Sequence, residues 1–112
     1  MTATYDHTGM PSSEIKDGAQ FIEPTRTWVT SPDAHPLKVQ WLYFEPESPI
    51  TGRIREEAHV AYRVDNLEEA IEGRELVGGP WEAEEQGRGF VRVAFVDVDG
   101  ALVEYLHYPG SA

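Results

Sequence analysis

The chain has 112 residues, enough for one domain that buries a core without disulfide bonds, and it contains no cysteine for a thiolate metal site or nucleophile. Nine basic and 20 acidic residues give a net charge of −11, which repels phosphate backbones and anionic lipids. We therefore expect neither nucleic acid nor a membrane surface as a partner. The sequence also shows no export signal and no long apolar run, which makes the cytoplasm the expected location.

The first half of the chain is predicted to hold four strands and no full helix. Residues 4–10 form a short strand that ends at Pro11, and the segments 21–23, 25–30 and 39–44 form three more. The segment 13–18, which lies between the first two strands, is too short and too broken for more than one helical turn. A polar linker is expected at residues 51–57.

The second half is predicted to contain a strand, a helix and then three strands. Residues 59–64 form the first strand, and Asp65 with Glu68 has the spacing of a capping box for a helix of about two turns. A turn at Gly78-Gly79-Pro80 precedes a candidate strand at residues 81–84.

The last two strands form a hairpin in the stretch FVDVDGALVEYLHY, from Phe95 to Tyr108, with a tight turn at Asp99-Gly100. On both sides of this turn, successive residues fall on alternate faces, with Leu102, Glu104 and Leu106 on one face of the last strand, as a strand pair requires. Glu104 falls in the middle of an apolar strand. A carboxylate buried alone would cost several kcal/mol, so Glu104 is expected to have a strong partner.

The two halves resemble each other as a degenerate tandem repeat. The segment VQWLYFEP aligns with VEYLHYP, so that Gln40 occupies the position of Glu104, and His7 lies in the first strand of one half as His59 does in the other. We interpret the chain as one domain, residues 1–112, with module one at 1–50, the linker at 51–57 and module two at 58–109.

This order of elements, with His59, the DGALVE turn and the VEYLHY strand, resembles the vicinal oxygen chelate superfamily. That superfamily includes glyoxalase I, methylmalonyl-CoA epimerase, extradiol dioxygenases, and fosfomycin- and bleomycin-resistance proteins. The resemblance implies an α+β fold in which two tandem βαβββ-type modules form a cupped mixed sheet, with most of the helix missing from the first module. It also implies a divalent metal held by His7, Gln40, His59 and Glu104.

The chemistry of these four side chains suits Ni, Co, Zn, Mn or Fe, because imidazole nitrogens and carboxylate or amide oxygens are ligands for such ions. A six-coordinate ion would keep two positions for a substrate with two oxygen atoms. Glu45 is the alternative to Gln40 if a bulge shifts the strand register. With Gln40 the set is closer to methylmalonyl-CoA epimerase, and with Glu45 it is closer to glyoxalase I.

The leading hypothesis is a metal-dependent isomerase, epimerase or lyase that stabilises an enolate of a small polar or anionic substrate. Glu104 is the candidate proton shuttle, and Glu45 is a second base if it reaches the cup. The alternatives are an extradiol-type Fe(II) dioxygenase that uses His7, His59 and Glu104, or a drug- or metabolite-binding protein without catalysis. A homodimer is expected, because the shortened first module leaves core surface to cover.

Three further features receive structural interpretations. The side chains of Trp28, Trp41 and Trp81 are expected to pack in the core. The acidic residues Glu82, Glu84 and Glu85 are interpreted as one solvated face, and His35 is interpreted as a surface residue.

Overall fold

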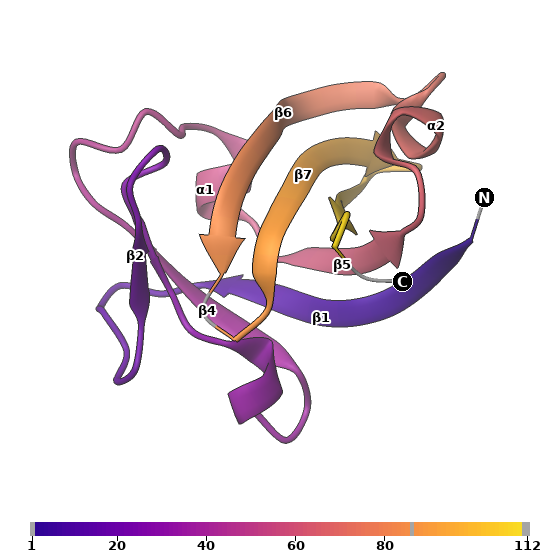
Figure 1. The fold of residues 1–112 in the computed structure, drawn as a ribbon. Coiled ribbons are helices and arrows are strands. Elements are labelled where there is room, and N and C mark those ends of the chain that lie inside the picture. The colour runs from indigo at the N-terminus through magenta and orange to yellow at the C-terminus, as the bar shows by residue number, and fades with distance from the viewer. Residues whose placement is uncertain (1, 86, 111–112) are drawn as a thin grey trace.

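The fold is a single eight-stranded sheet that curves into a nearly closed cup (Figure 1). The computed structural model describes residues 2–85 and 87–110. The strand order is β2-β3-β4-β1-β5-β8-β7-β6, and the strands are β1 (Ala3–Pro11), β2 (Gln20–Ile22), β3 (Thr27–Val29), β4 (Val39–Phe44), β5 (His59–Val64), β6 (Glu75–Glu85), β7 (Gly89–Val98) and β8 (Ala101–His107). Two short helices accompany the sheet, α1 (Arg53–Glu56) and α2 (Leu67–Ile71), together with a 3-10 turn at Pro32–Ala34. This confirms the predicted α+β fold with a reduced helix, while the proposed module limits stay a prediction.

The centre of the sheet has a local two-fold arrangement. β1 pairs antiparallel with β5, with His7 opposite Ala61 and Gly9 opposite His59. In each pair, a histidine of one strand lies opposite a small residue of the other strand. His7 and His59 therefore occupy equivalent positions, as the repeat in the sequence indicates.

The hairpin of β7 and β8 has the predicted turn. Asp99 and Gly100 have φ angles of 51° and 90°, which is the left-handed backbone that an Asp-Gly hairpin turn uses. The side chain of Asp97 accepts a hydrogen bond from the Gly100 amide at 3.0 Å, which ties the turn to the end of β7.

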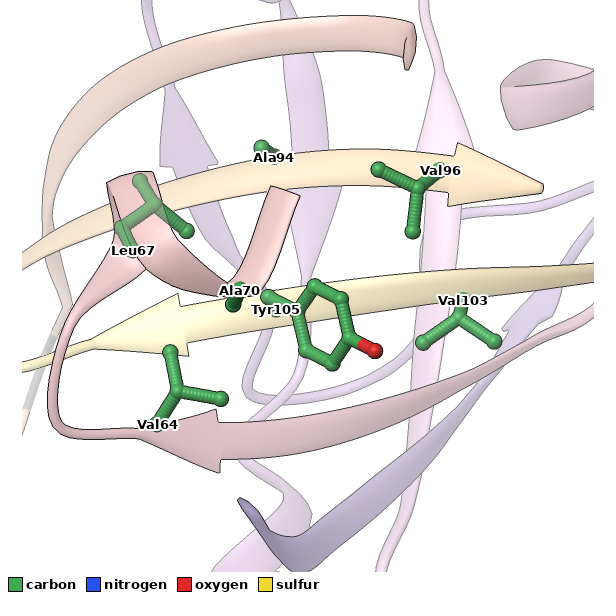
Figure 2. Packing of buried hydrophobic residues seen from close by; sticks show 7 residues of the cluster. All are labelled: Val64, Leu67, Ala70, Ala94, Val96, Val103 and Tyr105. Carbon is green, nitrogen blue, oxygen red and sulfur yellow. The ribbon is translucent and has the colours of Figure 1, made fainter. Parts of the chain in front are cut away.

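The convex face of the sheet is covered by α2. Figure 2 shows α2 packed over the strands through a cluster of buried residues, Val64, Leu67, Ala70, Ala94, Val96, Val103 and Tyr105. On β8 the residues of this cluster alternate with Leu102, Glu104 and Leu106, so Glu104 lies on the opposite, concave face.

Two local expectations from the sequence are corrected, the polar linker and the capping box of the second-half helix. The stretch 51–57 holds α1, because Ile54 packs with Ile50 in a buried cluster. The cap of α2 is Asn66, whose side chain accepts from the Glu69 amide at 2.9 Å. The side chain of Asp65 instead accepts a hydrogen bond from the Thr2 amide.

β6 is also longer than the candidate strand at 81–84, because the Gly78-Gly79-Pro80 segment does not end it. Register shifts between Leu76 and Trp81 absorb these residues within the β6–β7 pairing. The strand at 25–30 is shorter than expected, since Arg26 takes a φ of 48° in the preceding turn.

The two edge strands of the sheet meet and narrow the opening of the cup. The side-chain amide of Gln20 in β2 donates a hydrogen bond to the backbone oxygen of Glu84 in β6 at 2.9 Å. Among residues 2–85 and 87–110, no helix has the length and apolar character needed to cross a bilayer.

Replacing Leu67 by Ala should lower the free energy of unfolding by about 2–5 kcal/mol, the usual cost of removing a large buried side chain. Leu67 is the first residue of α2 and is fully buried against the sheet, with 0% of its surface exposed. Urea unfolding measures the loss. The matched control is Leu37→Ala, because Leu37 is 75% exposed and its truncation should change little. Equal losses in the two variants would contradict the packing of α2.

Candidate metal centre

Three buried side chains converge on the concave face of the sheet. His7 of β1, His59 of β5 and Glu104 of β8 each offer a ligand atom, and these atoms all lie within 4.8 Å of one another. Oε1 of Glu104 lies 3.1 Å from Nε2 of His59 and 3.4 Å from Nε2 of His7. The strong partner expected for Glu104 is therefore the pair of histidines.

The strand register brings Gln40 to the same region. β4 runs parallel to β1 with Gln40 opposite Gly9, and β8 runs parallel to β5 with Glu104 opposite Ala61. Gln40 and Glu104 thus occupy equivalent positions around the local two-fold axis. The side chain of Gln40 is buried, and it lines one cavity together with those of His59 and Glu104.

Glu45 lies in a different cluster. One of its carboxylate oxygens accepts a hydrogen bond from the Arg26 guanidinium at 2.6 Å, and the other accepts one from the Trp28 indole at 2.9 Å. It is not among the described residues that line the cavity. The structure therefore brings together His7, His59 and Glu104, places Gln40 in the lining of the same cavity, and places Glu45 apart from them.

His7 is held in one orientation by its neighbour in β1. Its Nδ1 lies 2.6 Å from the Asp6 carboxylate, which accepts a hydrogen bond from the Nδ1–H. Its Nε2 is buried and lies 3.4 Å from Oε1 of Glu104, but it makes no hydrogen bond of good geometry with any residue that the structure describes. A carboxylate that fixes the far nitrogen of an imidazole is the usual support of a metal-ligating histidine. Two imidazoles and a carboxylate, with an orphaned ring nitrogen in a buried site, fit a divalent ion.

The close approach of His59 to the backbone explains Gly9. A Cβ atom added to Gly9 would lie 2.1 Å from Cε1 of the His59 ring, much closer than any real contact. The ring of His59 therefore occupies the space above Gly9. The residue equivalent to Gly9 in β5 is the small, fully buried Ala61.

The surroundings of Glu104, His7 and Asp6 favour the charged form of each of these side chains. Burial acts to raise the pKa of Glu104, but the hydrogen bond with His59 and the nearby imidazole of His7 outweigh it and lower this pKa to about 2. Burial acts to lower the pKa of His7, but Asp6 and Glu104 raise it to about 9. The pKa of Asp6 falls to about 2, because hydrogen bonds from His7 and Arg88 outweigh its burial. Without a metal, the site thus holds a protonated imidazole between two carboxylates.

A cavity of about 100 Å³ opens beside the cluster. Its walls are mostly apolar and include Ile22, Leu42, Phe44, Ile50, Ile54, Trp81, Val91, Val93 and Phe95. Of the described residues around it, none is Lys or Arg. A substrate in this cavity would therefore find mostly apolar walls, with carboxyl groups at Glu104, Glu85 and Glu82.

Sequence reasoning missed two elements of the site. Glu85 is not part of a solvated face with Glu82 and Glu84, because it is half-buried on the inward side of β6 whereas the other two are exposed. Glu85 lines the cavity, and the exposed Glu82 also borders it. The alternation of β6 could have shown this, since Glu85 shares the parity of Trp81. The second element is the pair of Asp6 and Arg88. The Arg88 guanidinium donates a hydrogen bond to the Asp6 carboxylate at 2.8 Å, although the two residues are 82 positions apart in the sequence.

Comparison with known proteins supports the fold and leaves the family open. No family model and no curated protein matches the chain. Among solved structures, a hypothetical protein from Bacillus halodurans matches with a TM-score of 0.58 and 23% identity over 100% of this chain and 99% of its own. A mutant of 4-hydroxymandelate synthase from Streptomyces coelicolor matches with a TM-score of 0.53 and 10% identity, over 98% of this chain and 49% of the synthase. At these identities the matches show a shared fold, the cupped sheet, and no function.

Replacing Gly9 by Ala should weaken metal binding about 10- to 100-fold, the usual effect of disturbing the support of a ligand. The added methyl group would displace the His59 ring, which lies directly over Gly9. Isothermal titration with Co²⁺ measures the affinity. Gly110→Ala is the control, because nothing lies within 4 Å of a Cβ atom at Gly110. Wild-type affinity in Gly9→Ala would contradict the placement of His59 as a ligand.

The stability of the metal-free protein should be highest between about pH 4.5 and 6.5. The raised pKa of His7 adds to the free energy of unfolding. This contribution is complete below the ordinary pKa of 6.5 and is lost as the pH rises through about 9. The lowered pKa of Glu104 gives one that is complete above 4.5 and is lost as the pH falls through about 2. Urea unfolding in EDTA, measured from about pH 2 to pH 9, tests the loss of stability on the acid side and on the alkaline side. In His7→Gln the alkaline loss should disappear, and its persistence would contradict this assignment.

Proposed function

We propose that this protein is a divalent-metal-dependent enzyme of the glyoxalase type, an isomerase, epimerase or lyase that acts through an enolate of a small oxygen-bearing substrate. The observation that carries this proposal is the buried cluster of His7, His59 and Glu104 beside an apolar cavity. Buried ionisable groups at one end of a cavity are typical of catalytic sites.

Each of the four candidate ligands would supply one donor atom to the ion. His7 and His59 supply imidazole nitrogens, Glu104 supplies the negative charge, and Gln40 supplies an uncharged oxygen from the equivalent strand. The donor set suits Ni, Co, Zn, Mn or Fe. A 2+ ion with one carboxylate leaves the site near +1, which favours an anionic or enolate-forming ligand.

When bound, the ion would polarise a substrate carbonyl and lower the pKa of the adjacent C–H group. The apolar walls of the cavity exclude water and hold the carbon skeleton of the substrate. Asp6 binds Nδ1 of His7 and so keeps Nε2 of the same ring directed toward Glu104. The cavity volume of about 100 Å³ suits a small substrate better than a long one.

A second candidate is an Fe(II) dioxygenase. Two histidines and one carboxylate form the ligand face used by non-haem Fe(II) oxygenases, and the cluster contains this set without Gln40. The fold likeness to a mutant of 4-hydroxymandelate synthase also favours this candidate. Oxygen uptake with a catechol and ferrous iron, without proton exchange in a carbonyl substrate, would select it over the first.

The purified protein should contain about one divalent ion per chain by elemental analysis, because the cluster offers a single buried group of ligands. His59→Ala should lose this ion, whereas His35→Ala should keep it, since His35 is not part of the cluster and its Nδ1 accepts a hydrogen bond from the Leu37 amide. The metal-loaded protein should also catalyse deuterium incorporation from solvent into a 2-hydroxy-ketone, a 2-methyl-acyl compound or a keto-sugar.

Two results would contradict the proposal. A wild-type protein that takes up no divalent ion, even when ions are supplied, would exclude the metal-dependent class. A metal-loaded protein that exchanges protons in none of these substrates would exclude the enolate reaction.

A further inference from the structure

The side chain of Glu85 points into the cavity beside the proposed metal centre. In the last part of β6, residues 81, 83 and 85 are partly buried and alternate with the exposed residues 82 and 84. This is the two-residue period of a strand with one face turned inward. Glu85 lines the cavity together with His59 and Glu104, whereas Glu84 faces solvent.

Glu85 is held in place by a chain of hydrogen bonds that ends at a proposed metal ligand. The Tyr108 hydroxyl donates to Oε1 of Glu85 at 3.2 Å, and the Tyr108 oxygen accepts from the Arg88 guanidinium at 3.0 Å. The same nitrogen of Arg88 donates to Asp6 at 2.8 Å, and Asp6 accepts from His7. The position of the Glu85 carboxyl is thus tied to that of His7.

Glu85 also lines a second, smaller cavity on its other side. This cavity has a volume of about 60 Å³ and is lined by Glu85 with Gly18, Gln20, Val29, Thr30 and Ser31. The hydroxyl and amide groups of this lining can hold water. Glu85 therefore lines both an apolar cavity suited to substrate and a smaller cavity suited to water.

We propose that Glu85 is the acid–base residue of this site. It removes a proton from the carbon next to a substrate carbonyl in the larger cavity and exchanges that proton with solvent through the smaller one. The C–H bond breaks, its electron pair forms the C=C bond of the enolate, and the proton moves to a carboxylate oxygen of Glu85. Return of the proton to carbon completes the cycle without any change in oxidation state. This inference rests on the proposed function and adds its proton-transfer residue.

The surroundings of Glu85 suit this role. Burial raises its pKa above the ordinary value, and the negative charge of Glu104 raises it further, while Arg88, Tyr108 and His7 act in the opposite direction. A carboxyl whose pKa moves toward neutrality is a better base and a better conjugate acid at working pH.

The two other candidate bases are less free to act. Oε1 of Glu104 lies between the two histidines as a proposed metal ligand. Both carboxylate oxygens of Glu45 accept hydrogen bonds from residues outside the cavity.

The test compares Glu85→Gln with Glu84→Gln, its outward-facing neighbour, in Co²⁺-loaded protein. Deuterium uptake by hydroxyacetone, followed by proton NMR, should fall about 100-fold or more in Glu85→Gln, the usual contribution of a general base, and should not change in Glu84→Gln. The affinities for Co²⁺ and for acetohydroxamate, a ligand that binds through two oxygens, should match the wild type in both variants. Formate added to Glu85→Ala should restore part of the exchange, because it can replace the missing carboxyl group. If Glu85 had only a structural role, formate would restore no exchange.

A readout that needs no activity is the infrared band of the protonated carboxyl group. A band present in the wild type and missing in Glu85→Gln should titrate above the ordinary value of 4.5. Titration at or below 4.5 would overturn the inference.

The outcomes separate the inference from the function on which it rests. Wild-type exchange rates in Glu85→Gln, with Co²⁺ bound, would overturn the role of Glu85 and leave the metal-dependent enzyme standing. A wild-type protein that binds Co²⁺ but exchanges no proton of hydroxyacetone would overturn the role of Glu85 and count against the enolate reaction. Failure to bind Co²⁺ at all would overturn both.

Discussion

The antiparallel pairing of β1 with β5 is the constraint on which the candidate site depends. It places His7 opposite Ala61 and His59 opposite Gly9, so that the two imidazole rings lie 5.9 Å apart between their centroids. Each histidine can occupy this space because the residue opposite it on the neighbouring strand is small. A shift of one residue in this register would turn one histidine to the convex face, and the cluster with Glu104 would be lost.

Much of this arrangement could be predicted from the sequence, because strand parity and a tandem repeat are local signals. The alignment of VQWL with VEYL placed Gln40 and Glu104 in equivalent positions, and the parallel pairs β1–β4 and β5–β8 confirm this placement. The apolar strand around Glu104 indicated that the carboxylate would need strong partners, which are His7 and His59. The homodimer and the cytoplasmic location stay predictions.

The parts that sequence reasoning missed depend on long-range packing. Glu85 appears in the sequence as one member of an acidic run. Its parity with Trp81 indicates the inward face of β6, but it is the pairing of β6 with β7 that places this face at the cavity. Arg88 is 82 residues away from Asp6 along the chain, so no local pattern indicates that it supports the carboxylate beside His7. Similarly, α1 follows from the burial of Ile54 against the concave side rather than from helix propensity.

The central claim is that side chains from two matched halves of a strongly acidic chain converge upon one cation. An X-ray absorption spectrum of the Co²⁺-loaded protein measures the ligands of that cation directly. Our account predicts a first shell of nitrogen and oxygen atoms, with the outer-shell scattering of two imidazole rings. A shell of oxygen atoms alone, without imidazole scattering, would place the ion on surface carboxylates and contradict the account.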